Sequence, residues 1–149
     1  MKSGYHFCHT LTVRFAETDL QAVVFNANFL MYYDVAWTEY LRSNGLTYAE
    51  MIASGFDTLL VRTEVDFVSP ARFDDMLDIY VRTSSIRNSS LAVRFEMYNK
   101  QTDTLVNSAT STYVCVDEHT HHPVRVPDDL RVRLSRFEQT DLSAEDGIR

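Results

Sequence analysis

Cysteine, glycine and proline are all scarce in this chain of 149 residues. The two cysteines, Cys8 and Cys115, lack C-x-x-C spacing, which excludes a disulfide scaffold and a cysteine-ligated zinc site and favours two small hydrophobic core residues. With 4 glycines and 3 prolines, the chain is neither collagen-like nor of low complexity. No apolar run approaches the roughly 18 residues of a membrane span, and the first residues lack the apolar stretch of a signal peptide. We therefore expect a soluble cytoplasmic protein without a membrane partner.

Basic residues are also few, with 14 Lys and Arg against 21 Asp and Glu and a net charge of -7. A protein that follows nucleic-acid phosphates usually has a basic excess, so we expect no nucleic-acid partner. The sequence lacks a G-x-S-x-G elbow, a G-x-G-x-x-G turn, a phosphate-binding loop and an H-E-x-x-H motif. The stretch His119–His122 is rich in histidine, but metal ligands usually come from converging elements, and we interpret this stretch as a solvated turn without a metal.

The length and a hydrophobic share of 45 % suit one domain with a real core. We assign residues 1–137 to that domain and residues 138–149 to a polar tail that we expect to fray.

Hydrophobic periodicity predicts a strand and then a long helix. Apolar residues alternate from Phe7 to Phe15, as in a strand with one buried face. Over residues 27–44 the period becomes helical, and further apolar residues (Leu30, Met31, Val35) widen the stripe, which favours a helix enclosed by other structure. We expect Asn26 or Asn28 to cap this helix. Its main stripe comprises Phe29, Tyr32, Tyr33, Ala36, Trp37, Tyr40 and Leu41.

The rest of the chain predicts a sheet around that helix. A capping box at Thr47 and Glu50 opens a short second helix. Strands are predicted within 61–67, 77–81, 91–98 and 105–116, with short polar turns between them that suit antiparallel neighbours. Pro127 then opens a C-terminal helix. One sheet and one long helix must form each other's core, so we predict an α+β fold in which about five antiparallel strands wrap around a central helix.

The loop before the long helix is the strongest candidate for chemistry. It holds two carboxylates, Glu17 and Asp19, just before a helix start, where the first N–H groups lack partners and the helix dipole is positive. A carboxylate there can act on a carbonyl whose oxygen binds those N–H groups. The simpler interpretation is that Asp19 only binds loop amides and that the aromatic residues are core. Glu17 either raises the pKa of Asp19 or caps the loop, and we favour the cap.

Residues 13–29, Val-Arg-Phe-Ala-Glu-Thr-Asp-Leu-Gln-Ala-Val-Val-Phe-Asn-Ala-Asn-Phe, resemble the signature of hot-dog-fold acyl-CoA thioesterases of the 4-hydroxybenzoyl-CoA thioesterase type. Residues 64–75 resemble the second-strand segment of the same family, and the similarity extends over about residues 7–137. The resemblance implies a hot-dog fold and hydrolysis of an acyl-CoA thioester to a carboxylic acid and coenzyme A. It also implies a homodimer or homotetramer, and no cofactor apart from the coenzyme A of the substrate.

Carried over residue by residue, the resemblance places Asp19 on the catalytic aspartate, as nucleophile or general base. The backbone amide of Asn26 falls on the position that polarises the thioester carbonyl. Two residues depart from the family pattern. Ala22 replaces a glycine, and Asn26 replaces the histidine of one branch, so it cannot act as an imidazole acid or base.

Candidate substrate-binding residues are Phe25, Asn28 and Tyr33, which lie near these two positions in the sequence and of which Tyr33 would line the acyl pocket. Arg72 and Arg87, further along the chain, are candidates for the phosphates of coenzyme A. The acyl group, and the choice between coenzyme A and an acyl carrier protein, are left open. Two alternatives to a thioesterase also remain. One is a non-enzymatic module that binds acyl thioesters, and the other is a hot-dog dehydratase, which needs a histidine that the helix start lacks.

Overall fold

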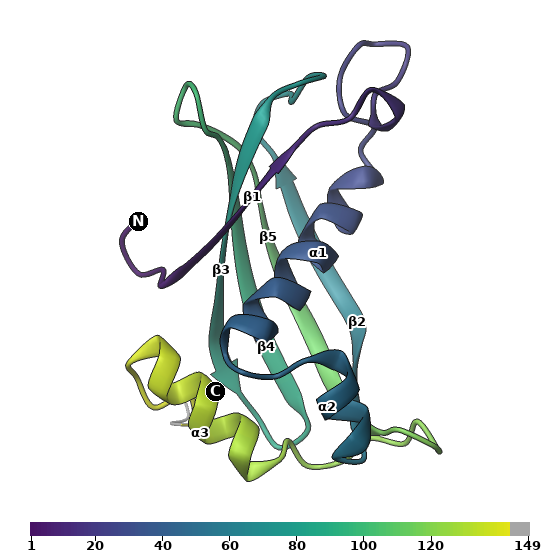
Figure 1. Cartoon of the computed structure of the whole chain (residues 1–149), viewed down its shortest axis with the longest axis vertical. Coiled ribbons are helices and arrows are strands. Elements are labelled where there is room, and N and C mark those ends of the chain that lie inside the picture. Colours follow the sequence, from purple (N-terminus) through teal and green to yellow (C-terminus); the bar gives the residue numbers. More distant parts are fainter. Residues whose placement is uncertain (144–149) are drawn as a thin grey trace.

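The computed structural model describes residues 1–143, which form one sheet and three α-helices. The elements in chain order are β1 (Phe7–Thr12), a 3-10 turn η1 (Phe15–Glu17), α1 (Asn28–Ser43), α2 (Tyr48–Ala53), β2 (Phe56–Phe67), β3 (Met76–Ile86), β4 (Ser90–Asn99), β5 (Thr104–Asp117) and α3 (Asp128–Glu138). All neighbouring strands are antiparallel, in the order β1-β3-β4-β5-β2. The sheet curls around α1, and α3 packs at the end where β3 finishes (Figure 1). The predicted α+β arrangement of five strands around one long helix is confirmed.

The core forms where one face of α1 meets the sheet. All seven residues of the predicted stripe are buried, and Ala36 and Tyr40 are 0 % exposed. The wide apolar stripe predicts a helix enclosed by other structure. This prediction is wrong for the single chain, because Leu30, Met31 and Val35 are 43 %, 40 % and 40 % exposed. The sheet covers one side of the helix only, so these three side chains lie at the surface of a single chain.

The ends of the helices follow the predicted local chemistry. Thr47 accepts a hydrogen bond from the backbone N–H of Glu50, whose carboxylate accepts one from the N–H of Thr47 at 2.7 Å, so the capping box is confirmed. Gly45 has a φ of +73° directly after α1, a conformation that glycine adopts without strain.

The first strand is shorter than the alternation of Phe7 to Phe15 predicts. It ends at Thr12 because the backbone of Val13 exchanges hydrogen bonds with the segment before β3, accepting from Asp74 and donating to Asp75. The chain then turns into η1, which leaves the side chain of Phe15 76 % exposed.

The second strand is longer than predicted, since β2 begins at Phe56 rather than near Val61. Leu59, Leu60 and Val61 are consecutive apolar residues, which hide the period of a strand, and the register shifts between Leu60 and Arg62. β2 lies at one edge of the sheet.

The segment after α3 begins with packed structure, although we expected it to fray. Leu142 is buried, and its carbonyl accepts a hydrogen bond from the N–H of Ile86 at 2.8 Å. The remainder of the predicted tail, 144–149, lies outside the described residues. None of the helices among residues 1–143 is long and apolar enough to cross a membrane.

A buried carboxylate, Glu138, attaches the end of α3 to the sheet and to α1. It accepts hydrogen bonds from the Tyr40 hydroxyl at 2.6 Å and the Thr83 N–H at 3.0 Å. Burial raises the pKa of Glu138 above its ordinary value, although these hydrogen bonds and the charges of Arg82 and His6 act to lower it.

This raised pKa predicts a pH-dependent stability. The folded chain holds the Glu138 proton more tightly than the unfolded chain, so this contribution is complete below the ordinary pKa of about 4.3 and is lost as the pH rises through the raised value. Glu138→Gln keeps an acceptor oxygen and removes the charge. We therefore expect its melting temperature, relative to the unmodified protein, to be higher at about pH 8 than at about pH 5. A relative melting temperature that falls between these two pH values contradicts the assignment.

Candidate active site

A tight loop between η1 and α1 fixes the position of Asp19. Thr18 and Val24 pair as an antiparallel bridge. The N–H of Asp19 donates to the carbonyl of Val23 at 2.9 Å, and the N–H of Ala22 donates to the carbonyl of Asp19 at 2.9 Å. The loop therefore holds its carboxylate on a closed turn rather than on a mobile segment.

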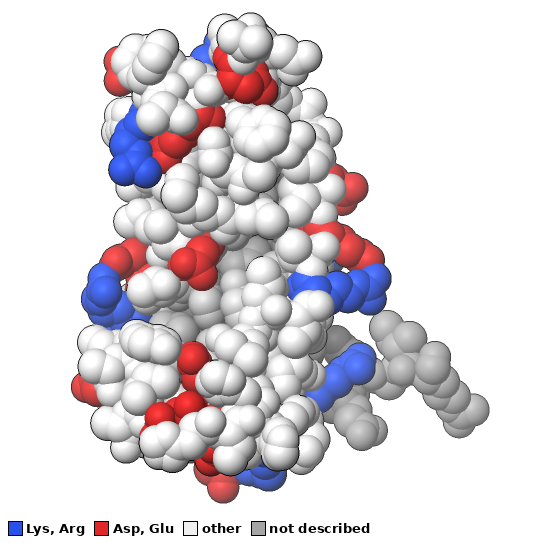
Figure 2. Space-filling view, turned by 90° about the vertical axis from the view of Figure 1, so that its right-hand side faces the viewer, with Lys and Arg blue, Asp and Glu red and all other residues white. Residues whose placement is uncertain are grey.

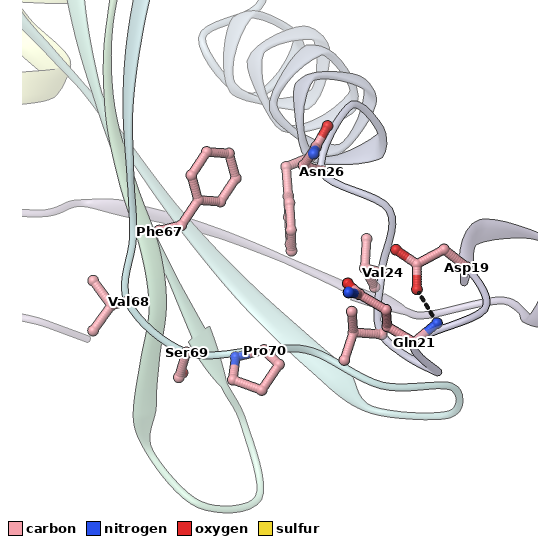
Figure 3. A pocket seen from close by; sticks show the side chains of 10 residues that line it. Asp19, Gln21, Val24, Asn26, Phe67, Val68, Ser69 and Pro70 are labelled. Atoms are coloured by element: carbon pink, nitrogen blue, oxygen red, sulfur yellow. Dashed lines mark hydrogen bonds between the residues drawn. The ribbon is translucent and has the colours of Figure 1, made fainter.

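The Asp19 side chain keeps one oxygen for the loop and leaves one for a ligand. Its Oδ1 accepts a hydrogen bond from the N–H of Gln21 at 2.8 Å. No group among residues 1–143 donates to the second oxygen, which points toward the cavity in Figure 3. The expectation that Asp19 binds a loop amide and the expectation that it faces a substrate are thus compatible.

The start of α1 supplies unpaired hydrogen-bond donors. The N–H groups of Phe25 and Asn28 bond to the carbonyls of Glu17 and Phe25 at 3.0 Å and 2.9 Å. Between them, the N–H groups of Asn26 and Ala27 have no acceptor among residues 1–143. The prediction that an asparagine caps the helix is wrong, because Ala27 is the N-cap residue and no side chain caps it. Two free donors therefore lie at the positive end of the helix dipole.

Asp19 and Asn26 line one cavity of about 310 Å³, a size that suits a small ligand (Figure 3). The opposite wall comes from the end of β2 and the turn after it, a contribution that the sequence analysis missed. This wall consists of Phe67, Val68, Ser69 and Pro70. The signal that pointed to it was the resemblance of residues 64–75 to the family's second-strand segment.

Glu17 acts as a cap, as favoured from the sequence. It is 5 % exposed, and its carboxylate accepts hydrogen bonds from the backbone and guanidinium of Arg14 and from the hydroxyl of Tyr32. Burial acts to raise the pKa of Glu17, but these hydrogen bonds outweigh it and hold the pKa below its ordinary value. The carboxylate is therefore charged and already bonded at neutral pH.

Two of the predicted substrate-binding residues have structural partners. The Asn28 side-chain amide donates to the carbonyl of Glu17 at 2.8 Å. Tyr33 is 3 % exposed, and its hydroxyl donates to Asn107 within the core. Phe25, in contrast, is 48 % exposed beside the helix start and does not line the cavity.

The two predicted arginines lie at opposite ends of the sheet. Arg72 is exposed, and its Nη1 lies 3.5 Å from the carbonyl of Ala22 in the Asp19 loop. Arg87 is in the turn after β3, where Arg131 donates to its carbonyl. That turn is at the end of the sheet near α3, opposite to the Asp19 loop (Figure 1).

The histidines of the 119–122 stretch are exposed in the turn after β5. Among the described residues, no three His, Cys, Asp or Glu side chains converge as metal ligands would.

Comparisons with known proteins show which family the chain resembles in sequence. The profile of the "Thioesterase-like superfamily" matches residues 13–134. The acyl-CoA thioester hydrolase YbgC of Escherichia coli O157:H7 is 31 % identical over 127 residues, 85 % of this chain and 92 % of that protein. The 1,4-dihydroxy-2-naphthoyl-CoA hydrolase of Thermosynechococcus vestitus is 24 % identical over 91 % of this chain and 92 % of its own.

A solved structure with the same fold is Slr0204 of Synechocystis, a 1,4-dihydroxy-2-naphthoyl-CoA thioesterase. It superimposes with a TM-score of 0.79 at 22 % identity, covering 86 % of this chain and 94 % of that one. An Aquifex aeolicus protein, AQ1494, gives a TM-score of 0.80 at 23 % identity, over 86 % of this chain and 98 % of its own. The predicted hot-dog fold is therefore confirmed.

The Asp19 loop carries a strained residue. Ala22 has a φ of +58°, in the left-handed region where an L side chain costs about 1–2 kcal/mol and glycine does not. It stands where the resembled family has glycine. We expect Ala22→Gly to raise the free energy of unfolding by about 0.5–1 kcal/mol, after the entropy that glycine adds to the unfolded chain. Urea denaturation measures this change.

Ala16→Gly is the matched control, since Ala16 is also exposed but has a negative φ within η1. It should lower the free energy of unfolding by about 0.5–1 kcal/mol. Equal losses in both variants would show that Ala22 is not strained.

Proposed function

The chain belongs to the thioesterase-like superfamily, and we propose that it hydrolyses acyl-CoA thioesters in the cavity between Asp19 and the start of α1. Membership of this family, with relatives named as acyl-CoA thioester hydrolases and 1,4-dihydroxy-2-naphthoyl-CoA hydrolases, makes it a thioester hydrolase. One observation carries the assignment to this site: the Asp19 carboxylate, which has an unbonded oxygen, shares a cavity with Asn26, whose N–H group is unbonded, as is that of the next residue, Ala27.

The proposed chemistry follows from the properties of a thioester. The N–H groups of Asn26 and Ala27 donate hydrogen bonds to the carbonyl oxygen, and these bonds strengthen as that oxygen becomes negative. Thiolate is a good leaving group because a free thiol has a pKa of about 8.5, so no acid must protonate it as it departs. The replacement of the family's histidine by Asn26 is compatible with this reaction, since the donor is a backbone group.

Two routes lead to the same products. As a nucleophile, Asp19 adds to the thioester carbonyl and expels coenzyme A thiolate, and water then hydrolyses the resulting mixed anhydride. As a general base, Asp19 removes a proton from a water molecule, which adds to the carbonyl before the thiolate leaves. Either route consumes one water, releases a carboxylic acid and coenzyme A, and needs no cofactor.

The substrate's phosphates need cations on a chain with a net charge of -7. The exposure of Arg72 next to the Asp19 loop supports this role for it. Arg87 lies at the other end of the sheet, so it reaches a substrate at Asp19 only from a second copy of the chain.

We propose that the second copy binds through the β2 edge. This strand has a neighbour on one side only, and Leu59, Leu60 and Val61 are 39 %, 48 % and 58 % exposed on it. The face on which β2 lies is largely uncharged, with scattered acidic and basic side chains (Figure 2). Pairing two such edges would satisfy the free backbone groups and bury these side chains.

Replacing Asp19 by asparagine tests the proposed site. The amide oxygen of the new side chain can still accept the hydrogen bond from Gln21, so folding should be unchanged, whereas the amide can neither attack a carbonyl nor take a proton. We expect Asp19→Asn to reduce thiol release from acyl-CoA substrates by roughly 10³-fold or more.

Asp74→Asn is a matched control, because Asp74 is exposed at the same end of the sheet as Asp19 and its φ of +70° suits asparagine. This variant should keep full activity. Turnover by Asp19→Asn within tenfold of the unmodified protein would remove Asp19 from the reaction, and tight acyl-CoA binding without thiol release by the unmodified protein would favour a binding module.

The oligomer is tested by light scattering. We expect a mass of at least twice the 17.2 kDa of one chain, as a dimer or tetramer. A mass of one chain at micromolar concentration would contradict pairing through β2.

A further inference from the structure

The residue that joins the Asp19 loop to α1 is Glu17, which lies two positions before Asp19 and outside the reaction described above. We propose that Glu17 is a positioning residue, which keeps the Asp19 carboxylate and the free N–H groups of α1 in one geometry through its bond to Tyr32. This inference rests on the proposed function, since Glu17 and Tyr32 lie outside the cavity and would act on it through Asp19, the start of α1 and Phe29.

The Glu17 carboxylate ties together the end of β1 and the first turns of α1. Its Oε1 accepts hydrogen bonds from the Arg14 N–H at 2.8 Å and from the Tyr32 hydroxyl at 2.9 Å. Its Oε2 accepts from the Arg14 guanidinium at 2.8 Å and 3.1 Å. Tyr32 is 2 % exposed, so its hydroxyl has no access to bulk water as an alternative partner.

The carbonyl of the same residue orders the helix start. It accepts the N–H of Phe25 at 3.0 Å and the side-chain amide of Asn28 at 2.8 Å. The Phe25 donor is thereby occupied, and the next two N–H groups, at Asn26 and Ala27, are left for a ligand. One residue thus determines where the chain enters α1 and which donors remain free.

The bond between Glu17 and Tyr32 also affects the wall of the cavity. Tyr32 packs edge to face against Phe29, with ring centroids 5.9 Å apart, and Phe29 lines the cavity. A shift of Tyr32 would therefore move both the donors and the wall.

Burying a charged group is costly, and an uncharged residue can cap a short turn. A buried carboxylate that accepts four hydrogen bonds is suited instead to fixing the segment after β1 and the first turns of α1 in one arrangement. Geometry of this kind matters for catalysis, because a displacement of about 1 Å between reacting groups can reduce the rate by about 10²-fold.

Tyr32→Phe removes only the hydroxyl and keeps the ring against Phe29. We expect kcat for acyl-CoA hydrolysis to fall by about ten- to a hundredfold with KM changed by less than about threefold, since the bound substrate is retained but misaligned. The matched control is Tyr40→Phe, on the same helix, which removes a hydroxyl that also donates to a buried carboxylate, Glu138. The melting temperature of Tyr40→Phe should fall by about as much as that of Tyr32→Phe, and its kcat should stay unchanged.

Glu17 variants separate positioning from direct catalysis. Glu17→Gln keeps an oxygen at the position that binds the Arg14 N–H and Tyr32, so kcat should stay within about threefold of the unmodified protein. Glu17→Ala removes that oxygen and should lose about as much kcat as Tyr32→Phe. The two Glu17 variants test the same proposal if Tyr32→Phe fails to fold.

Three results would overturn the inference while leaving the proposed function intact. In the first, Tyr32→Phe and Glu17→Ala lose no more kcat than Tyr40→Phe, although Asp19→Asn is inactive. In the second, Glu17→Gln is as inactive as Glu17→Ala, which would indicate a charge requirement. In the third, Tyr32→Phe raises KM alone. Full activity of Asp19→Asn would instead contradict the proposed function.

Discussion

The first turn of a helix cannot satisfy its own N–H groups, and among residues 1–143 no side chain caps the start of α1. The groups of Asn26 and Ala27 stay free because Glu17 occupies the donor before them and because the sheet fixes the rest of the helix from behind. The features around the helix start are arranged about these free N–H groups. The closed loop holds a carboxylate in the same cavity as Asn26, and the end of β2 supplies Phe67 and Val68 as the opposite wall. A thioester, with an electrophilic carbonyl and a good leaving group, suits such a site.

Much of the fold was predictable because its signals are local. The stripe of α1 and the Thr47–Glu50 capping box depend on residues a few positions apart, and the structure confirms both. The errors occurred where distant segments decide. β1 stops at Thr12 because Val13 pairs with residues about 60 positions later, and the early start of β2 is set by pairing with β5. Leu30, Met31 and Val35 are as apolar as core residues, and the sequence does not say that the sheet leaves their side of the helix uncovered.

The site divides in the same way. Asp19 and Asn26 could be predicted because loop and helix start are adjacent in sequence and because the segment resembles a known signature. The opposite wall, from Phe67 to Pro70, meets them only after the chain has passed along α1, α2 and β2. Arg72 and Arg87 looked equivalent as exposed cations, yet the topology places one beside Asp19 and the other at the far end of the sheet. Tyr33 belonged to the helical stripe, and its hydroxyl proved to be bonded to Asn107 in the core.

The most direct test of the central claim is a crystal structure of the protein with an acyl-CoA analogue whose thioester sulfur is replaced by a methylene group. The account predicts the ketone oxygen within hydrogen-bond distance, about 3 Å, of the backbone nitrogens of Asn26 and Ala27, with the Asp19 carboxylate facing the carbonyl carbon. An analogue bound with its carbonyl away from the start of α1, or with Asp19 turned out of the cavity, would contradict it.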